Sequence, residues 1–196
     1  MPLWGATDSD ESKPKFLTDE QKKLVYATKS GWVLENGALT GNDNPNADPE
    51  ILVAIGELAT SIGSADITEI EFISTAFDVS AGGTIQVRAR FNEEVDVDTS
   101  GGVPFLAITN GNQGTGSGRG PHNAAYSSGT GTNELVFAIT IGAAAGSIAA
   151  DDVLVVGAIA INLHSGTIKD AGTSTVSTIT NAAGVGTAAG TITVVA

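Results

Sequence analysis

Residues 82–98 read GGTIQVRARFNEEVDVD, and this stretch decides the fold. From Thr84 to Phe91, apolar and polar side chains alternate, a period that is typical of a β-strand with one buried face. Val95 and Val97 continue the alternation with acidic neighbours. The stretch therefore predicts a strand over Thr84–Phe91. Its expected apolar face carries Ile85, Val87, Ala89 and Phe91, and its expected polar face carries Gln86, Arg88 and Arg90.

The remainder of the chain after residue 63 has the same β character. Short apolar or alternating runs recur there, separated by turns rich in Gly, Ser and Asn. This many short strands at regular spacing predict a β-sandwich over residues 64–196. The further strands expected are residues 67–73, 103–109, 124–127, 134–141, 153–156, 158–163, 176–180 and 191–195.

The first residues, Met1–Lys15, predict an extended arm. Pro2 and Pro14 block regular strand pairing, and the acidic residues between them favour solvent. Leu3 and Trp4 are large and apolar and have no partners nearby in the sequence. Either the arm folds back on its own domain, or this pair anchors it in a pocket on another subunit. We favour the second, because buried aromatic side chains often anchor interfaces.

Residues 16–63 predict a small α+β module. Thr18 and Gln21 fit a capping box at the start of a short helix. Strands are expected over residues 32–34 and 51–55, and the unbroken apolar run of the second predicts a buried strand. One helix and two short strands make a core small enough to need a neighbour for stability.

Charge and composition exclude several functions. The formal net charge of −13 disfavours nucleic-acid binding, which requires clustered Lys and Arg. The sequence shows no apolar run near the roughly 18 residues of a membrane span and no secretory signal pattern at its start. It has no cysteine and hence no thiolate chemistry. Between Lys13 and Lys29, five lysines face only two acids, which indicates either a solvated helix face or docking on an acidic partner.

We expect no catalytic site and no cofactor. The two histidines, His122 and His164, match no zinc-ligand spacing. Residues 114–120 (GTGSGRG) lack the Gly-Lys-Ser/Thr of a phosphate-binding loop, so they predict a surface loop. Arg119 is the only charge in that loop, and we interpret Arg119 and His122 as candidate surface-contact residues.

Calcium is the one metal ion whose binding the sequence suggests, because calcium binds hard oxygen ligands and these often lie in loops. Glu93, Glu94, Asp96 and Asp98 cluster after the strand predicted over Thr84–Phe91, and a second acidic pair stands at residues 151–152. Glu94, Asp96 and Asp98 are the weak candidates. The spacing is not that of an EF-hand, and alternating carboxylates more often form a solvated strand face, so we predict no metal site.

Several motifs after residue 80 resemble the bacterial Ig-like repeats of large surface and adhesin-type proteins. The resemblance covers about residues 80–175 and implies an Ig-like β-sandwich whose role is folding and display. The usual closing motif departs here to Asp-Ala-Gly-Thr, and the insertion at residues 112–121 is unusual. The motifs that match in order are Gly83–Ile85, Phe91–Glu93, Pro104–Leu106, Tyr126–Phe137 and Gly166–Asp170.

The beginning of the chain resembles virion structural proteins of marine tailed phages, including cyanophages. The similar segments are MPLWG with the following SKPK, ATKSGWV at residues 27–33 and EILVAIGELATSIGSADIT at residues 50–68. The resemblance covers about residues 1–70. It implies a module that binds the virion and carries an Ig-like domain, an arrangement thought to aid weak attachment to cell-surface glycans.

Together these observations predict a non-enzymatic virion protein, made in the host cytoplasm, that decorates or cements the capsid surface. Its expected partners are the major capsid protein, neighbouring copies of itself and host-surface glycans, with no nucleic acid and no membrane. The alternatives are a tail, collar or fibre protein and a glycan-binding adhesin module. The expected capsid-docking residues are Leu3, Trp4, Lys13, Lys15, Phe16, Lys22, Lys23 and Trp32.

Overall fold

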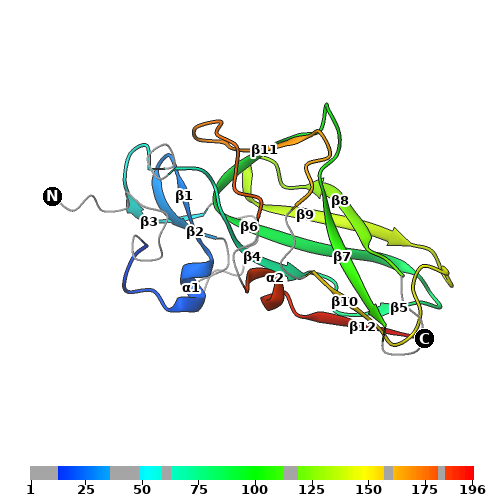
Figure 1. The fold of residues 1–196 in the computed structure, drawn as a ribbon. Helices are drawn as coiled ribbons and strands as arrows, with labels where there is room; N and C mark the ends of the chain where they lie inside the picture. The colour runs from blue at the N-terminus through cyan, green and yellow to red at the C-terminus, as the bar shows by residue number, and fades with distance from the viewer. Residues whose placement is uncertain (1–12, 36–48, 59–62, 113–118, 157–160, 181–183) are drawn as a thin grey trace.

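The computed structural model describes residues 13–35, 49–58, 63–112, 119–156, 161–180 and 184–196, and these form a mainly β fold (Figure 1). Its helices are short, and its strands vary widely in length. The elements are α1 (Asp19–Lys23), β1 (Val25–Thr28), β2 (Gly31–Leu34), β3 (Glu50–Ala54), β4 (Ile67–Phe72), β5 (Phe77–Asp78), β6 (Gly83–Asp98), β7 (Phe105–Asn112), β8 (His122–Ser128), β9 (Thr132–Ile141), β10 (Asp152–Val155), β11 (Thr167–Asp170), α2 (Val185–Ala188) and β12 (Thr191–Val195).

The strands join into one mixed sheet, with one buried core in the N-terminal module and a larger one in the rest of the fold. Its order is β3-β2-β1-β6-β9-β8-β7-β10-β12-β5, and β4 and β11 also pair with β6. Two pairings are parallel, β1 with β6 and β5 with β12, and the other pairings are antiparallel. The mainly β prediction is confirmed.

Strand β6 is the strand that the opening stretch predicts. Ile85, Val87, Ala89 and Phe91 are all buried in the main core, so the expected apolar face is confirmed. The first half of β6 lies between β4 and β9, and its second half pairs with β11. Strand β6 therefore pairs directly with β4, β9 and β11 of the fold that follows the N-terminal residues. This part, from β4 to β12, is here called the β body.

The ladder between β6 and β9 breaks in the middle of β6. Arg90 pairs with Glu134, but the next paired residue, Val95, lies opposite Thr132. Other segments dock on the residues in between. The backbone amide of Asp66 donates to Oδ1 of Asn92 at 2.7 Å, and the amide of Asn92 donates to the carbonyl of Asp66 at 3.0 Å.

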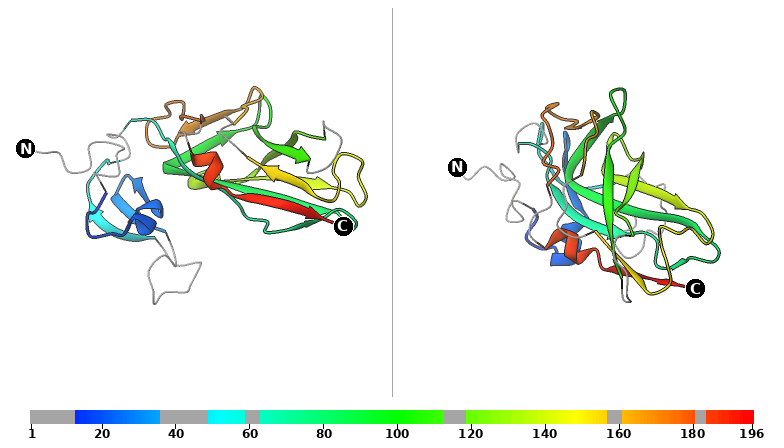
Figure 2. Two further views of the ribbon diagram at one scale, coloured as in Figure 1. Left: turned by 60° about the horizontal axis from the view of Figure 1, so that its bottom comes forward. Right: turned by 45° about the vertical axis from the view of Figure 1, so that its right-hand side comes forward.

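The N-terminal module consists of α1 and the meander β1–β2–β3. It joins the β body at the same break in β6, where Ala27 of β1 pairs with Glu93. The module lies at one end of the molecule and the C-terminus at the other (Figures 1 and 2). Its own small core consists of Leu17, Val25, Ala27, Trp32, Leu34 and Leu58.

Several expectations are corrected. The strand predicted over residues 51–55 is β3. The prediction that it is buried is wrong, because β3 lies at the edge of the sheet, where the side chain of Ile51 is 55% exposed. Residues 158–160 lie outside the described part of the chain. Asn162, Val176 and Thr178 form isolated bridges instead of strands. The helix that begins after Thr18 is expected to continue through Leu24, Val25 and Ala27 and to end at residues 29–31, but α1 ends at Lys23, and Val25–Thr28 form β1 because they pair with β2. Strands β5 and β11 and helix α2 are not predicted, because each is short and has little periodicity of its own.

The hairpin between β8 and β9 is held by two glycines and a tyrosine. Gly129 and Gly131 have φ values of 114° and 77°, which non-glycine residues rarely adopt. The amide of Thr130 donates to the Tyr126 hydroxyl at 2.9 Å, and the amide of Gly131 donates to the Val95 carbonyl at 2.8 Å. The turn is thereby fixed against the second half of β6.

Replacing Gly129 with Ala is expected to lower the free energy of unfolding by about 3 kcal/mol. An added Cβ would lie 1.9 Å from the carbonyl oxygen of Glu134, so the backbone must shift as well as adopt an unfavourable φ. Gly131→Ala is the matched control. It meets no atom within 4 Å and carries the φ penalty alone, about 1 kcal/mol. Urea unfolding measures both, and equal losses would contradict the steric argument.

Candidate functional site

The structure separates the predicted docking residues into buried and exposed groups. Leu3 and Trp4 lie outside the described residues. Lys13 is 3% exposed, and its Nζ donates to the carbonyl of Lys22 at 2.7 Å. Trp32 is 1% exposed in the module core. Lys13 and Trp32 are therefore structural parts of the module and cannot themselves touch a partner in this conformation.

The exposed docking candidates lie beside the start of the described chain. Phe16 is 74% exposed, the most exposed of the large apolar side chains in the described residues, and Lys15 next to it is also exposed. Lys22 and Lys23 pair with Asp19 and Glu20 within α1 at 3.2 and 3.1 Å, which partly neutralises their charge. The accessible candidate surface is therefore centred on Lys15 and Phe16.

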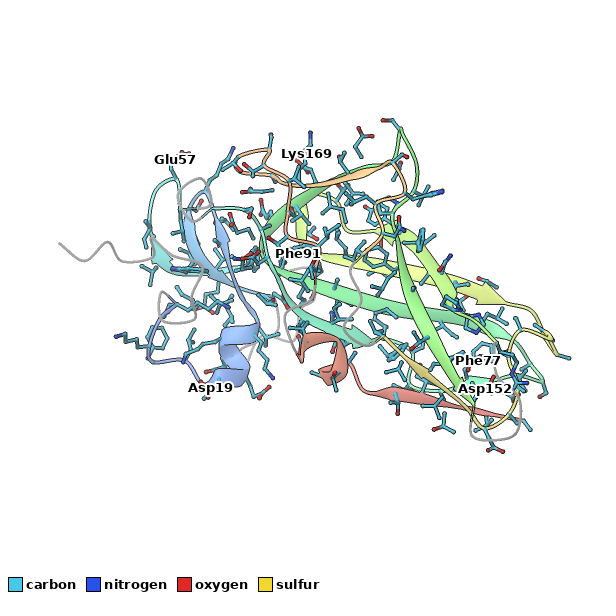
Figure 3. The ribbon with its side chains drawn as sticks, in the orientation of Figure 1. Asp19, Glu57, Phe77, Phe91, Asp152 and Lys169 are labelled. Atoms are coloured by element: carbon cyan, nitrogen blue, oxygen red, sulfur yellow. The ribbon has the colours of Figure 1, made fainter. Side chains whose placement is uncertain are left out.

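A cluster of ion pairs, here called the junction cluster, connects the module to the β body. It contains Glu35 after β2, Glu69 and Glu71 of β4, Arg88 and Arg90 of β6, and Asn133 and Glu134 of β9. Phe91, labelled in Figure 3, marks its level along β6, next to the module. The sequence pattern does not reveal this cluster, because its carboxylates come from distant segments; its one local sign is the pair Arg88 and Arg90 on the same strand face.

Arg90 is the centre of the junction cluster, and its side chain is 9% exposed. Its Nη1 lies 2.6 Å from Glu69, its Nε lies 2.6 Å from Glu134, and the same Nε lies 3.4 Å from Glu35. Arg88 pairs with Glu71 and with Glu134. Because the Arg90 guanidinium is shared by carboxylates from both parts, it fixes the orientation of the module on the β body.

The junction cluster holds more carboxylates than guanidinium groups. Burial is the main cause that raises the pKa of Glu35, and the nearby Glu134 raises it further. The hydrogen bond from Asn133 Nδ2 at 2.9 Å and the charge of Arg90 act in the opposite direction. Burial in the junction cluster thus disfavours the ionised form of Glu35.

A second polar cluster surrounds Asp152 at the far end of the β body, near Phe77 (Figure 3). The Arg119 guanidinium donates to both carboxylate oxygens of Asp152, at 2.7 and 2.9 Å. Asn110 Nδ2 and the Ala149 amide donate to the same carboxylate at 3.0 and 2.9 Å. These donors, led by the Arg119 hydrogen bonds, lower the pKa of Asp152 to about 2.

The two candidate surface-contact residues belong to this second cluster. His122 is buried, and its Nε2 lies 3.3 Å from Asn110 Nδ2. Burial lowers the pKa of His122. The His122 side chain therefore does not lie on an outer contact surface, and Arg119, about one-third exposed, anchors the segment that follows the glycine-rich residues. Contact of the loop itself with a partner stays a prediction.

The calcium candidates form no cage. Glu94, Asp96 and Asp98 alternate along β6, and Oδ1 of Asp98 accepts a hydrogen bond from the Ser100 amide at 2.8 Å. Over the described ranges, no three His, Asp or Glu side chains come together in a way that could hold a metal ion. The described residues thus contain an exposed aromatic side chain at the module end, the junction cluster and the polar cluster around Asp152.

Comparison with protein-family models, with curated proteins and with solved structures finds no match for this chain. In the part of the chain that the structure describes, neither helix is long and apolar enough to span a membrane.

At pH 7, the substitution Glu35→Gln is expected to leave the free energy of unfolding unchanged or to raise it by up to about 1 kcal/mol. The raised pKa means that the folded state binds a proton more tightly at Glu35, so wild-type stability contains a component that increases as pH falls through this raised value. Gln is neutral throughout and should lack that component. Urea unfolding between pH 7 and pH 4 measures it.

Glu134→Gln is the matched control for Glu35→Gln. This substitution replaces a carboxylate that contacts both Arg88 and Arg90 with a neutral amide. We therefore expect the free energy of unfolding to fall by about 2 kcal/mol or more. If Glu35→Gln destabilised the protein as much as this control does, the excess of acid in the junction cluster would not be the governing feature.

Asp152→Asn is expected to lower the free energy of unfolding at pH 7 by about 2 kcal/mol, because charge-assisted bonds from Arg119 are lost. The lowered pKa of Asp152 makes its contribution complete above the unfolded value near 4 and lost as pH falls toward about 2. The variant should lack this acid-dependent loss. Asp151→Asn, at an exposed neighbouring position with a positive φ that Asn tolerates, should change little.

Proposed function

We propose that the chain is a non-enzymatic structural protein of a phage virion that binds the capsid surface as a decoration or cement protein. Its partners would be the major capsid protein and neighbouring copies of itself. The β body would be an Ig-like sandwich displayed outward, with host-surface glycans as its external ligands. The protein would be made in the host cytoplasm and act on the particle.

The observation that carries the proposal is the exposed pair Lys15 and Phe16 at the root of the arm. Phe16 is 74% exposed, and aromatic side chains are enriched among the residues that contribute most to protein–protein binding. It belongs to the module at one end of the molecule, and the strand that closes the sequence, β12, ends at the other (Figure 2). Docking through the module would direct the far end of the β body away from the shell.

The junction cluster supports this arrangement. A display domain on a flexible linker would sample many orientations, whereas Arg90 ties Glu35 of the module to Glu69 and Glu134 of the β body. Buried ion pairs add little net stability but favour one geometry over others, which suits a protein that must present one end. The acidic net charge would also keep decorated particles apart.

The arm would allow the protein to bridge neighbouring capsid subunits and so to cement the shell. A segment that reaches a neighbouring subunit converts a second contact into an intramolecular event, which raises the overall affinity without a new interface of large area. The structure changes where the arm should be cut for a test. Lys13 and Pro14 are buried in the module, so a deletion must end at residue 12 to leave the fold intact.

Deletion of residues 2–12 and the substitution Phe16→Ser should each reduce the number of copies per purified particle, by about tenfold or more for the deletion. The measurement is the ratio of this protein to the major capsid protein in particles. For the wild type, a decoration protein should approach one copy per capsid subunit or one per three. A control substitution, Val176→Ser, removes an exposed apolar side chain on the β body, 59% exposed, and should not change occupancy.

The copy number per particle also distinguishes the decoration proposal from the alternative functions. A few copies per hundred capsid subunits would place the protein in the tail, collar or a fibre, where ring symmetry limits the number of sites. Absence from particles would remove the virion proposal and favour a glycan-binding adhesin module. Full occupancy by the protein lacking residues 2–12 would show that the arm is not the docking element.

A further inference from the structure

The side chain of one asparagine joins His122 to Asp152. Asn110 lies in β7, His122 begins β8 and Asp152 begins β10, and the pairing of these strands brings the three residues together. Nδ2 of Asn110 lies 3.0 Å from Oδ2 of Asp152, 3.3 Å from Nε2 of His122 and 3.5 Å from the carbonyl oxygen of Ser147. His122 is 6% exposed and Asp152 is 0% exposed, so both ends of this contact are shielded from water.

The orientation of the Asn110 amide determines the protonation state of His122. The neighbours of Nδ2 include a carboxylate oxygen and a carbonyl oxygen, which only accept hydrogen bonds, so the amino group must face them. An amino group only donates, and Nε2 of His122 must therefore accept, which places the proton of the neutral ring on Nδ1. Among the described residues, Asn110 makes the only hydrogen bond to this ring. The arrangement therefore requires a neutral His122.

The charged groups near His122 belong to Asp152 and its partner. Strand β7, which pairs with β8 here, and β12, which pairs with β10, contain no charged residue, and the sequence of residues 113–118 adds none. Arg119 neutralises the Asp152 carboxylate, and the neighbouring Asp151 is exposed. Burial is the main cause that lowers the pKa of His122, and the charge of Asp152 opposes it. His122 therefore becomes protonated below its usual value near 6.5, where Asp152, with a pKa of about 2, is still ionised.

We propose that His122, Asn110 and Asp152 form an amide relay, in which protonation of His122 turns the Asn110 side-chain amide over and withdraws its hydrogen bond from Asp152. A protonated Nε2 is a donor and cannot face an amino group. The turn brings Oδ1 of Asn110 to the ring, and this oxygen is buried and has no hydrogen bond among the described residues in the present orientation. The same turn places Oδ1 beside the Asp152 carboxylate, where two acceptors repel each other.

The relay acts on two segments that Asp152 holds at the end of the β body away from the module (Figure 3). Oδ2 of Asp152 accepts from Asn110, from Nε of Arg119 at 2.9 Å and from the amide of Ala149 at 2.9 Å. An Asp152 carboxylate that moves away from Oδ1 of Asn110 weakens the other two bonds as well. Acid conditions therefore loosen the segment that begins at Arg119 and the turn before β10.

The test is an NMR titration of the full chain, labelled with ¹³C and ¹⁵N, between about pH 8 and pH 5. We expect the His122 ring signals, the Asn110 side-chain amide signals and the Arg119 Nε–H signal to shift with one common midpoint. Hydrogen exchange of the Ala149 amide, corrected for its intrinsic dependence on pH, should become about tenfold faster across that midpoint.

Three variants separate the relay from other effects of pH. His122→Gln keeps a neutral acceptor beside Asn110 at every pH and should abolish the coupled changes. His164→Gln is the matched control, because it removes the other, exposed histidine and should leave the changes at Arg119 and Ala149 as in the wild type. Asn110→Leu removes the amide, so His122 should still titrate while Arg119 and Ala149 no longer follow it.

Arg119 and Ala149 signals that still followed His122 in Asn110→Leu would overturn the proposal, because the charge of the ring would then act directly on Asp152. The wild-type protein supplies a test that needs no variant to fold. Asn110 side-chain amide signals that stayed constant while His122 titrated would show that the amide does not turn.

Discussion

The fold depends on one strand, β6, which pairs with four other strands along its length. Its first half lies between β4 and β9, and its second half lies against β11. Its ladder with β9 is interrupted between Arg90 and Val95. Backbone groups released by that break are then paired by Asp66 and by β1. The defect in β6 is therefore the attachment point for the N-terminal module.

The side chains at the break explain why the module has one orientation. A hydrophobic contact would tolerate sliding, but the Arg90 guanidinium has donors in fixed directions and contacts carboxylates from three separate elements. The net energy of such a cluster is small, because desolvation offsets most of the attraction. Its effect is on geometry: an alternative placement of the module would leave buried charge without a partner.

The two ends of the molecule have different properties. The module end has the exposed side chain of Phe16 and the apolar strand β3 at the edge of the sheet. Both features are typical of surfaces to which another segment can bind. At the opposite end, the Asp152 carboxylate accepts hydrogen bonds from Arg119, Asn110 and the Ala149 amide. This difference between the two ends is consistent with the proposal that the protein docks through the module and displays the far end of the β body.

The sequence by itself determined the β class, the buried face of β6, the strand that closes the chain and the capping box of α1, because each depends on periodicity or chemistry within a few residues. Only the tertiary structure decided that Trp32 and Lys13 are buried, that β3 is an edge and that Arg90 meets Glu35. Burial and pairing of these residues depend on segments distant in the chain. An apolar run such as ILVA has the same local pattern in a central strand and at an edge, and its neighbours alone distinguish the two.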